Sequence, residues 1–186
     1  MSVLLVIAGP SGVGKGTIVR RLLELDPSIW VSISATTRRP RAGEVDGREY
    51  WFLEPAEFQR RFDEGAFLEA FDVFGARYGT PREPIEAHLA TGEDVLAEVD
   101  VNGALAIKDA FPDALLVFIK PPSREVLRNR LHARDQAGDA AEHERRLAEA
   151  DAEEAKAATF DRIVVNDDLE RAVEEIAVLV EARRGA

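Results

Sequence analysis

Hydrophobic residues in this chain follow two alternating patterns, short continuous runs and longer stretches with helical spacing. Residues 3–8 form a continuous apolar run, which is typical of a strand buried on both faces. Residues 15–25 instead place Ile18 and Leu22 on one side of a helix. The same reasoning predicts strands over 30–33, 94–99, 115–119 and 162–165, and helices over 102–110, 123–134 and 169–183.

This alternation of strands and helices predicts an α/β fold with a parallel sheet covered by helices on both faces. Open sheets of this kind bind ligands at the carboxyl ends of their strands. At 186 residues, the chain has the length of one domain of ordinary size.

Three segments depart from this alternation. Residues 36–92 carry shorter strand signals around a short helix that begins at Pro55, which predicts a small mixed-sheet insertion. Residues 135–141 are small and polar, so we expect a mobile flap there. Residues 140–158 are rich in Ala and Glu and are interpreted as an exposed helix. The strand signals of the insertion lie over 50–53, 68–74 and 78–80.

The composition is that of a soluble globular protein, with 46% hydrophobic and 32% charged residues. No apolar run reaches the roughly 20 residues that a membrane-spanning helix needs. The first residues carry no basic region of the kind that begins a signal peptide. We therefore expect a cytoplasmic protein with no membrane partner.

Several kinds of site are excluded by what the sequence lacks. There is no cysteine, so the chain has no disulfide, thiolate metal site or cysteine nucleophile. Its histidines, His88, His132 and His143, do not have the spacing of metal ligands. A net charge of −11 argues against a nucleic-acid surface, which needs an exposed basic face.

A glycine-rich segment directly after the first predicted strand has the features of a nucleotide phosphate loop. Backbone N–H groups of such a loop turn inward around phosphate oxygens, and the following helix points its positive dipole end at them. Lys15 would reach the β- and γ-phosphates. The residues expected to bind ATP here are Gly9, Pro10, Ser11, Gly12, Val13, Gly14, Lys15, Gly16 and Thr17.

Gly16 departs from the usual form of this loop. The signature places Ser or Thr directly after the lysine, where its hydroxyl binds Mg²⁺, and glycine has no side chain. Two interpretations stay open: Thr17 supplies the hydroxyl, or Mg²⁺ is held mostly by waters and phosphates.

A second candidate site lies in the insertion. Residues 32–44 contain three arginines next to several hydroxyl side chains, and this segment alone fits an anionic ligand and a solvated basic loop equally well. The only two tyrosines of the chain, Tyr50 and Tyr78, lie in the same insertion. A phenol hydroxyl beside arginines can donate to a phosphate, which favours the anionic ligand.

Seven motifs spread over nearly the whole chain are GPSGVGKGT at 9–17, SATTRRPRAGEVDGREYWF at 34–52, FLEAFDVFGARYGTP at 67–81, VDVNGA at 99–104, PPS at 121–123, RLHARDQ at 130–136 and VVNDDL at 164–169. In content and order they resemble the guanylate kinase family. The resemblance implies a P-loop kinase with a parallel sheet core, a small mixed α/β GMP-binding subdomain and a mobile lid. The implied core covers 1–33, 93–125 and 147–186, the GMP-binding subdomain 34–92, and the lid about 126–146.

The resemblance also implies the residues that bind GMP. Glu69 is the key to base choice, because a carboxylate accepts from both the N1–H and the exocyclic amine of guanine, whereas adenine presents an acceptor at N1. A site built on such bonds can reject an analogue lacking them by about 10⁴–10⁵. The implied phosphate contacts are Arg38, Arg41, Tyr50 and Tyr78, and the implied base contacts are Ser34, Glu69, Thr80 and Asp100.

For the donor nucleotide, the resemblance implies that lid arginines close over the transferring phosphate. Arg130, Arg134 and Arg146 match these arginines, and Asn166 matches a contact near the adenine of ATP. The segment after Arg134 differs from the family pattern and is one residue longer before the next Arg-Leu pair. Arg145 therefore competes with Arg146 for the last lid position.

The implied activity is in-line phosphoryl transfer from ATP to GMP with Mg²⁺, and we expect dGMP to be accepted as well. ATP and GMP are then the small-molecule partners, and the oligomeric state stays open. One alternative is a related phosphotransferase acting on AMP or a phosphorylated sugar. Another is a non-catalytic module that binds phosphopeptides, although such modules tend to lack the phosphate loop that this chain keeps.

Overall fold

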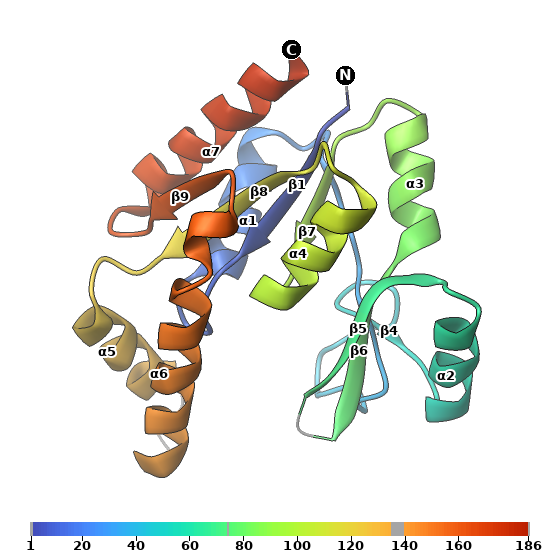
Figure 1. Cartoon of the computed structure of the whole chain (residues 1–186), viewed down its shortest axis with the longest axis horizontal. Coiled ribbons are helices and arrows are strands. Elements are labelled where there is room, and N and C mark those ends of the chain that lie inside the picture. The colour runs from blue at the N-terminus through green and yellow to red at the C-terminus, as the bar shows by residue number, and fades with distance from the viewer. Residues whose placement is uncertain (1, 74, 135–139, 186) are drawn as a thin grey trace.

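The computed structural model describes residues 2–73, 75–134 and 140–185, and a parallel sheet of five strands lies at its centre (Figure 1). Ile7 pairs with Glu98 on one side and with Val117 on the other, so the three middle strands end at the same edge. In spatial order the strands are β2 (Trp30–Val31), β7 (Val95–Glu98), β1 (Leu4–Ala8), β8 (Leu115–Lys120) and β9 (Arg162–Val165).

Helices cover both faces of this sheet, which confirms the predicted α/β fold. Successive residues of β1 point to opposite faces. Leu5 and Ile7 join the core under α1 (Lys15–Leu25) and α7 (Leu169–Arg184). Leu4 and Val6 join the core under α3 (Arg82–Ala90) and α4 (Val101–Ala110). Burial on both faces explains why the strands appear as continuous apolar runs.

The insertion forms a second, four-stranded sheet below the central one in Figure 1. Helix α2 (Pro55–Asp63) begins at Pro55, whose missing N–H costs nothing at the first helical position. Phe58 of this helix stacks on Phe67 over a small core of its own. The strands in spatial order are β4 (Trp51–Phe52), β3 (Ala35–Thr36), β6 (Ala76–Pro81) and β5 (Phe67–Val73).

Some predicted boundaries were wrong. The strand predicted over 30–33 ends at Val31, because the chain leaves the central sheet after Ser32 donates its N–H to the carbonyl of Leu96. Strand β3 and helix α3 were not predicted at all. Two residues are too few to show a periodic pattern, and α3 buries only Ile85 of its side chains.

Two further helices, α5 (Arg124–Arg134) and α6 (Ala140–Glu154), extend to the same side of the central sheet as the second sheet (Figure 1). They pack on each other through a small apolar cluster that includes Leu127 and Leu147. Helix α6 and the short helix η1 (Ala157–Thr159) account for most of the exposed helix predicted over 140–158. The flap predicted over 135–141 lies, for residues 135–139, outside the described residues.

Within the described ranges, no helix has the length and apolar character needed to cross a membrane. The same ranges contain no group of three or more His, Cys, Asp or Glu residues that could hold a metal ion.

Candidate active site

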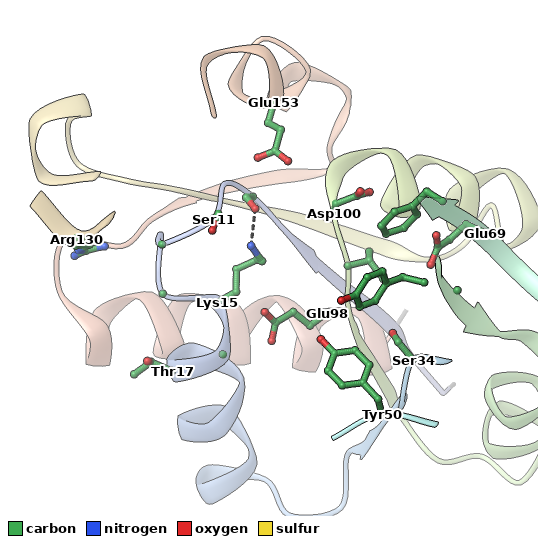
Figure 2. Close-up of a pocket in the computed structure, with 18 residues that line it drawn as sticks. Ser11, Lys15, Thr17, Ser34, Tyr50, Glu69, Glu98, Asp100, Arg130 and Glu153 are labelled. Carbon is green, nitrogen blue, oxygen red and sulfur yellow. Dashed lines mark hydrogen bonds between the residues drawn. The ribbon is translucent and has the colours of Figure 1, made fainter. Parts of the chain in front are cut away.

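A cleft of about 610 Å³ opens at the carboxyl ends of β1 and β7, between the glycine loop and the second sheet (Figure 2). It brings together residues that lie far apart in the sequence. Its walls come from the loop, the second sheet, the start of α4 and helices α5 and α6. The lining residues are Gly9, Ser11, Gly12, Gly14, Lys15, Gly16, Thr17, Ser34, Tyr50, Glu69, Phe71, Tyr78, Gly79, Glu98, Val99, Asp100, Arg130 and Glu153.

The glycine loop takes a backbone path that side chains would obstruct. Gly9 and Gly14 have φ angles of 145° and 101°. A Cβ on Gly9 would lie 2.3 Å from the carbonyl oxygen of Ile119, and one on Gly14 would lie 2.6 Å from Nδ2 of Asn166. The loop therefore packs tightly against β8 and the segment after β9, and α1 begins directly behind it.

Lys15 lies across this loop. Its ammonium group donates to the carbonyl oxygen of Gly9 at 2.6 Å (Figure 2) and to that of Pro10 at 3.2 Å. The lysine thus has its charge at the point where the loop would surround a phosphate.

Two polar side chains support the loop from behind. Asn166 is buried and donates from Nδ2 to the carbonyl oxygen of Val13 at 2.8 Å. Arg130 donates to the same carbonyl at 2.9 Å and to the backbone carbonyl of Asn166 at 3.1 Å. Arg130 lines the cleft, whereas Asn166 does not. The structure therefore gives Asn166 a role in shaping the loop.

Glu98, which the sequence analysis did not select, lies beside Gly16. Its Oε2 atom is 3.7 Å from the position of a Cβ on Gly16, where this loop usually has a hydroxyl side chain. Thr17 also lines the cleft, but Figure 2 shows its side chain pointing away from Glu98. The sequence signal that could have identified Glu98 is its place at the carboxyl end of a predicted strand, where open sheets of this kind bind ligands.

At the other end of the cleft, Glu69 is enclosed between the second sheet and α4. Its Oε1 atom accepts a 2.5 Å hydrogen bond from the hydroxyl of Thr80. Its Oε2 atom is buried and has no hydrogen-bond partner among the described residues. The pKa of Glu69 is raised to about 7, mainly by burial and also by the nearby Asp100, while the hydrogen bonds from Thr80 oppose the shift.

Helix α4 fits closely against this carboxyl group because its third residue is glycine. A Cβ on Gly103 would lie 3.3 Å from Cδ of Glu69. The N–H of Gly103 donates to Oδ1 of Asp100 at 2.7 Å, so Asp100 caps the helix and is held beside Glu69. Ser34 lines the same part of the cleft.

A cluster of charged and phenolic side chains lies next to this end. Arg38 forms a two-pronged ion pair with Glu44, with distances of 3.0 and 2.9 Å, and donates from Nε to the hydroxyl of Tyr78 at 3.2 Å. The rings of Tyr50 and Tyr78 meet edge to face. The Glu44 carboxylate holds the pKa of Arg38 above its ordinary value, and burial raises the pKa of Tyr50.

Glu44 was not selected from the sequence, yet it connects Arg38 and Arg41. Besides Arg38, it accepts the backbone N–H of Arg41 at 2.7 Å. The side chain of Arg41 is exposed, and neither Arg38 nor Arg41 lines the cleft.

Of the two predicted lid arginines whose side chains the structure describes, Arg130 lines the cleft and Arg146 does not. Arg146 and Glu153 are seven residues apart on α6 and therefore share one helix face, and Glu153 lines the cleft. Arg145 pairs with Glu149 at 2.8 Å and lines a neighbouring hollow of about 410 Å³. This hollow shares Asp100 and Glu153 with the cleft, so the last lid position stays open between Arg145 and Arg146. The side chain of Arg134 lies outside the described part of the chain.

Comparison with known proteins gives consistent results. The family model described as "Guanylate kinase" matches residues 1–183. The sequence is 53% identical over 181 residues to the guanylate kinase of Gloeobacter violaceus, covering 97% of this chain and 87% of the relative. It is 51% identical over 177 residues to that of Synechocystis sp., covering 95% and 92%. The crystal structure of guanylate kinase from Anaplasma phagocytophilum is similar with a TM-score of 0.79 and 32% identity, covering 98% and 86%.

Proposed function

This chain belongs to the guanylate kinase family, and from that premise we infer that it transfers the γ-phosphoryl group of ATP to GMP, giving ADP and GDP. One observation supports this function more than any other. A single cleft connects the glycine loop with the Glu69 oxygen that has no hydrogen-bond partner in the described part of the chain. A candidate phosphate-binding element and a candidate reader of guanine therefore face the same space.

On the donor side, we propose that the backbone N–H groups of residues 9–17 bind the ATP phosphates. These groups and the start of α1 provide partial positive charge without a titrating group. Lys15 would exchange its two backbone carbonyl partners for phosphate oxygens, which are stronger acceptors for an ammonium group. Such a fixed arrangement favours the transition state by placing positive charge where negative charge is transferred.

The residues beside the loop fit Mg²⁺, the ion that accompanies ATP in kinases. Glu98 supplies a carboxylate next to the missing side chain of Gly16, and we propose it as the first candidate to hold the ion. Thr17 stays the second candidate. With few protein ligands, waters and phosphates would complete the coordination, as is common for Mg²⁺. When bound, the ion neutralises charge on the phosphate oxygens.

On the acceptor side, we propose that the second sheet and α2, within residues 34–92, form the GMP-binding subdomain. Arg38, Arg41, Tyr50 and Tyr78 would bind the GMP phosphate. Glu69 would accept hydrogen bonds from guanine, with Ser34, Thr80 and Asp100 around the base. The buried Oε2 atom of Glu69 lacks a partner among the described residues, and guanine N1–H would supply one. We expect dGMP to be accepted as well.

We propose that residues 126–146, which include most of α5 and the first part of α6, act as the lid. Arg130, Arg134 and Arg146 would then neutralise the transferring phosphoryl group when the lid closes. Closure aligns the acceptor oxygen with the γ-phosphate and excludes water that would otherwise hydrolyse ATP. The proposed core comprises residues 1–33, 93–125 and 147–186.

A panel of acceptors with ATP tests this function directly. GMP, dGMP, AMP and a phosphorylated sugar are assayed at steady state, with and without Mg²⁺, by coupling ADP formation to a dehydrogenase. We expect turnover with GMP and dGMP that requires Mg²⁺. Preference for AMP or a sugar phosphate would overturn the acceptor assignment, and failure to bind ATP would favour a non-catalytic module. A cytoplasmic location and the lack of nucleic-acid binding stay predictions.

A further inference from the structure

The carboxyl group of Glu69 has one oxygen engaged by Thr80 and one oxygen that faces the cleft without a partner among the described residues. We propose that Glu69 selects the base as a titrating group: its carboxylate binds guanine with release of a proton, and its protonated acid admits a purine with an acceptor at N1. This inference rests on the proposed function, in which Glu69 reads the base.

The elements that pack on β5 together disfavour the charged form of Glu69, although one of them opposes this effect. Strand β6 contributes the Thr80 hydroxyl, the one neighbour that favours the carboxylate. Helix α4 contributes Asp100, a second negative charge, and the uncharged backbone of Gly103. Helix α2 buries only Phe58 toward the sheet.

No cationic side chain is among the causes of the pKa shift of Glu69. A carboxyl group with these neighbours keeps its proton to higher pH than an exposed one. Its pKa of about 7 means that both forms are populated near neutral pH in the free protein.

The two forms of Glu69 present different groups to a base. The carboxylate can accept from both N1–H and the amine of guanine. The acid has one O–H donor, which would face the N1–H donor of guanine unfavourably but can donate to N1 of adenine. GMP binding therefore draws Glu69 to its ionised form, and the proton leaves to solvent. Because GMP and AMP would select opposite forms, the ratio of their kcat/KM values should rise about tenfold per pH unit.

Proton release on GMP binding is the direct test. Calorimetric titrations in two buffers with different ionisation enthalpies give the number of protons released per GMP bound. We expect Glu69 to contribute about 0.9 proton at pH 6, about 0.5 at pH 7 and about 0.1 at pH 8. The phosphate of GMP also titrates near pH 6, so the matched control is Glu69→Gln, which keeps the phosphate site and cannot ionise. Equal proton release by the wild type and this variant would overturn the proposal.

Thr80→Val provides a second test that does not depend on tight binding by the glutamine variant. Valine keeps the shape of threonine and removes the hydrogen bond that favours the carboxylate. At each pH, the GMP/AMP ratio of kcat/KM should then be lower than in the wild type, because a higher pKa of Glu69 leaves less of the carboxylate. Because the two nucleotides carry the same phosphate, its ionisation cancels in this ratio.

A ratio that does not change between pH 6 and 8.5 in the wild type, with GMP still phosphorylated, would overturn the proton-linked selection and leave the proposed function intact. Absence of GMP phosphorylation at every pH would overturn the proposed function itself.

Discussion

The two ends of the cleft are built differently. At the donor end, the loop carries its chemistry in the backbone: Gly9 and Gly14 adopt positive φ angles, and their missing side chains let the loop press against β8 and Asn166. At the acceptor end, charged side chains bind other side chains: Arg38 pairs with Glu44, and Glu69 accepts a hydrogen bond from the hydroxyl of Thr80.

This difference follows from what each end has to bind. Every nucleoside triphosphate carries the same phosphate chain, which backbone N–H groups recognise without a titrating group. One base among several can be recognised only by hydrogen-bond donors and acceptors that are held in position around it. Where such a group is titratable, its burial shifts its pKa. Substitutions at the donor end should therefore act through geometry, and substitutions at the acceptor end through charge and pH.

The largest effect is expected at the one charged side chain of the glycine loop. Lys15→Ala should reduce turnover about 10²–10³-fold or more, because a preorganised positive charge at the transferring phosphate is lost. Steady-state kinetics with ATP and GMP measures this effect. Lys120→Ala, which removes an exposed lysine paired with Glu154, is the control and should change turnover less than twofold. A Lys15→Ala enzyme with near wild-type turnover would refute the proposed role.

At the acceptor end, Arg38→Ala should raise KM for GMP about 10–100-fold, since charge-assisted hydrogen bonds contribute about 1.5–3 kcal/mol. Glu44→Gln should have a smaller effect in the same direction, because the guanidinium stays but loses the partner that orients it. Arg39→Ala is the matched control, since Arg39 is exposed and adjacent. An equal rise in KM for Arg38→Ala and Arg39→Ala would mean that only the overall positive charge matters.

The geometric character of the donor end can be tested with two glycines of similar φ. Gly14→Ala should weaken ATP binding about tenfold or more, because the new Cβ would lie 2.6 Å from Nδ2 of Asn166. Gly92→Ala has a similar φ of 88° but nothing within 4 Å of the new Cβ. It should therefore cost only about 1 kcal/mol in the free energy of unfolding and leave ATP binding unchanged. Fluorescence titration with an ATP analogue and urea denaturation measure the two effects.

The Mg²⁺ requirement of turnover tests whether Glu98 or Thr17 holds the ion at the donor end. Glu98→Gln should raise the Mg²⁺ concentration needed for half-maximal turnover about tenfold, because a neutral amide holds a cation or its waters less well. Thr17→Val, whose side chain points away from Glu98 in Figure 2, should have a smaller effect. The reverse order would assign the ion to Thr17.

The donor end was largely predictable from the sequence, and the acceptor end only in part. A glycine loop between a strand and a helix is a local signal, so Lys15 and its neighbours could be assigned from spacing. Glu98 stands near the end of a predicted strand, but it takes the register that pairs it with Ile7 to show that it lies beside the loop. Glu44 and Gly103 depend on contacts across turns and between sheets, and no local pattern reports such contacts.

A related limit applies to Asn166. The resemblance to the family implies a contact near adenine for it, which stays a prediction; the structure adds that its side chain supports the loop from behind. Which groups a side chain contacts in the folded chain depends on tertiary packing, and a short sequence motif does not report that packing.

The smallest expected effect concerns stability, and it distinguishes the two ends by pH. The pKa of Glu69 is raised, so the folded protein binds this proton more tightly than the unfolded chain. The free energy of unfolding should therefore fall as pH rises from about 4.5 to about 7, and the full cost of the buried charge is present above pH 7.

Glu69→Gln removes this ionisation and should increase the free energy of unfolding by about 1–3 kcal/mol at pH 8, with little change at pH 4.5. Urea denaturation at the two pH values measures the difference, and Glu175→Gln on the exposed face of α7 is the control. A gain of the same size at both pH values would show that the glutamine acts through packing rather than charge. A gain confined to high pH would mean that the buried charge used for base recognition lowers the stability of the fold. The glycines of the donor end carry no charge and have no such pH-dependent cost.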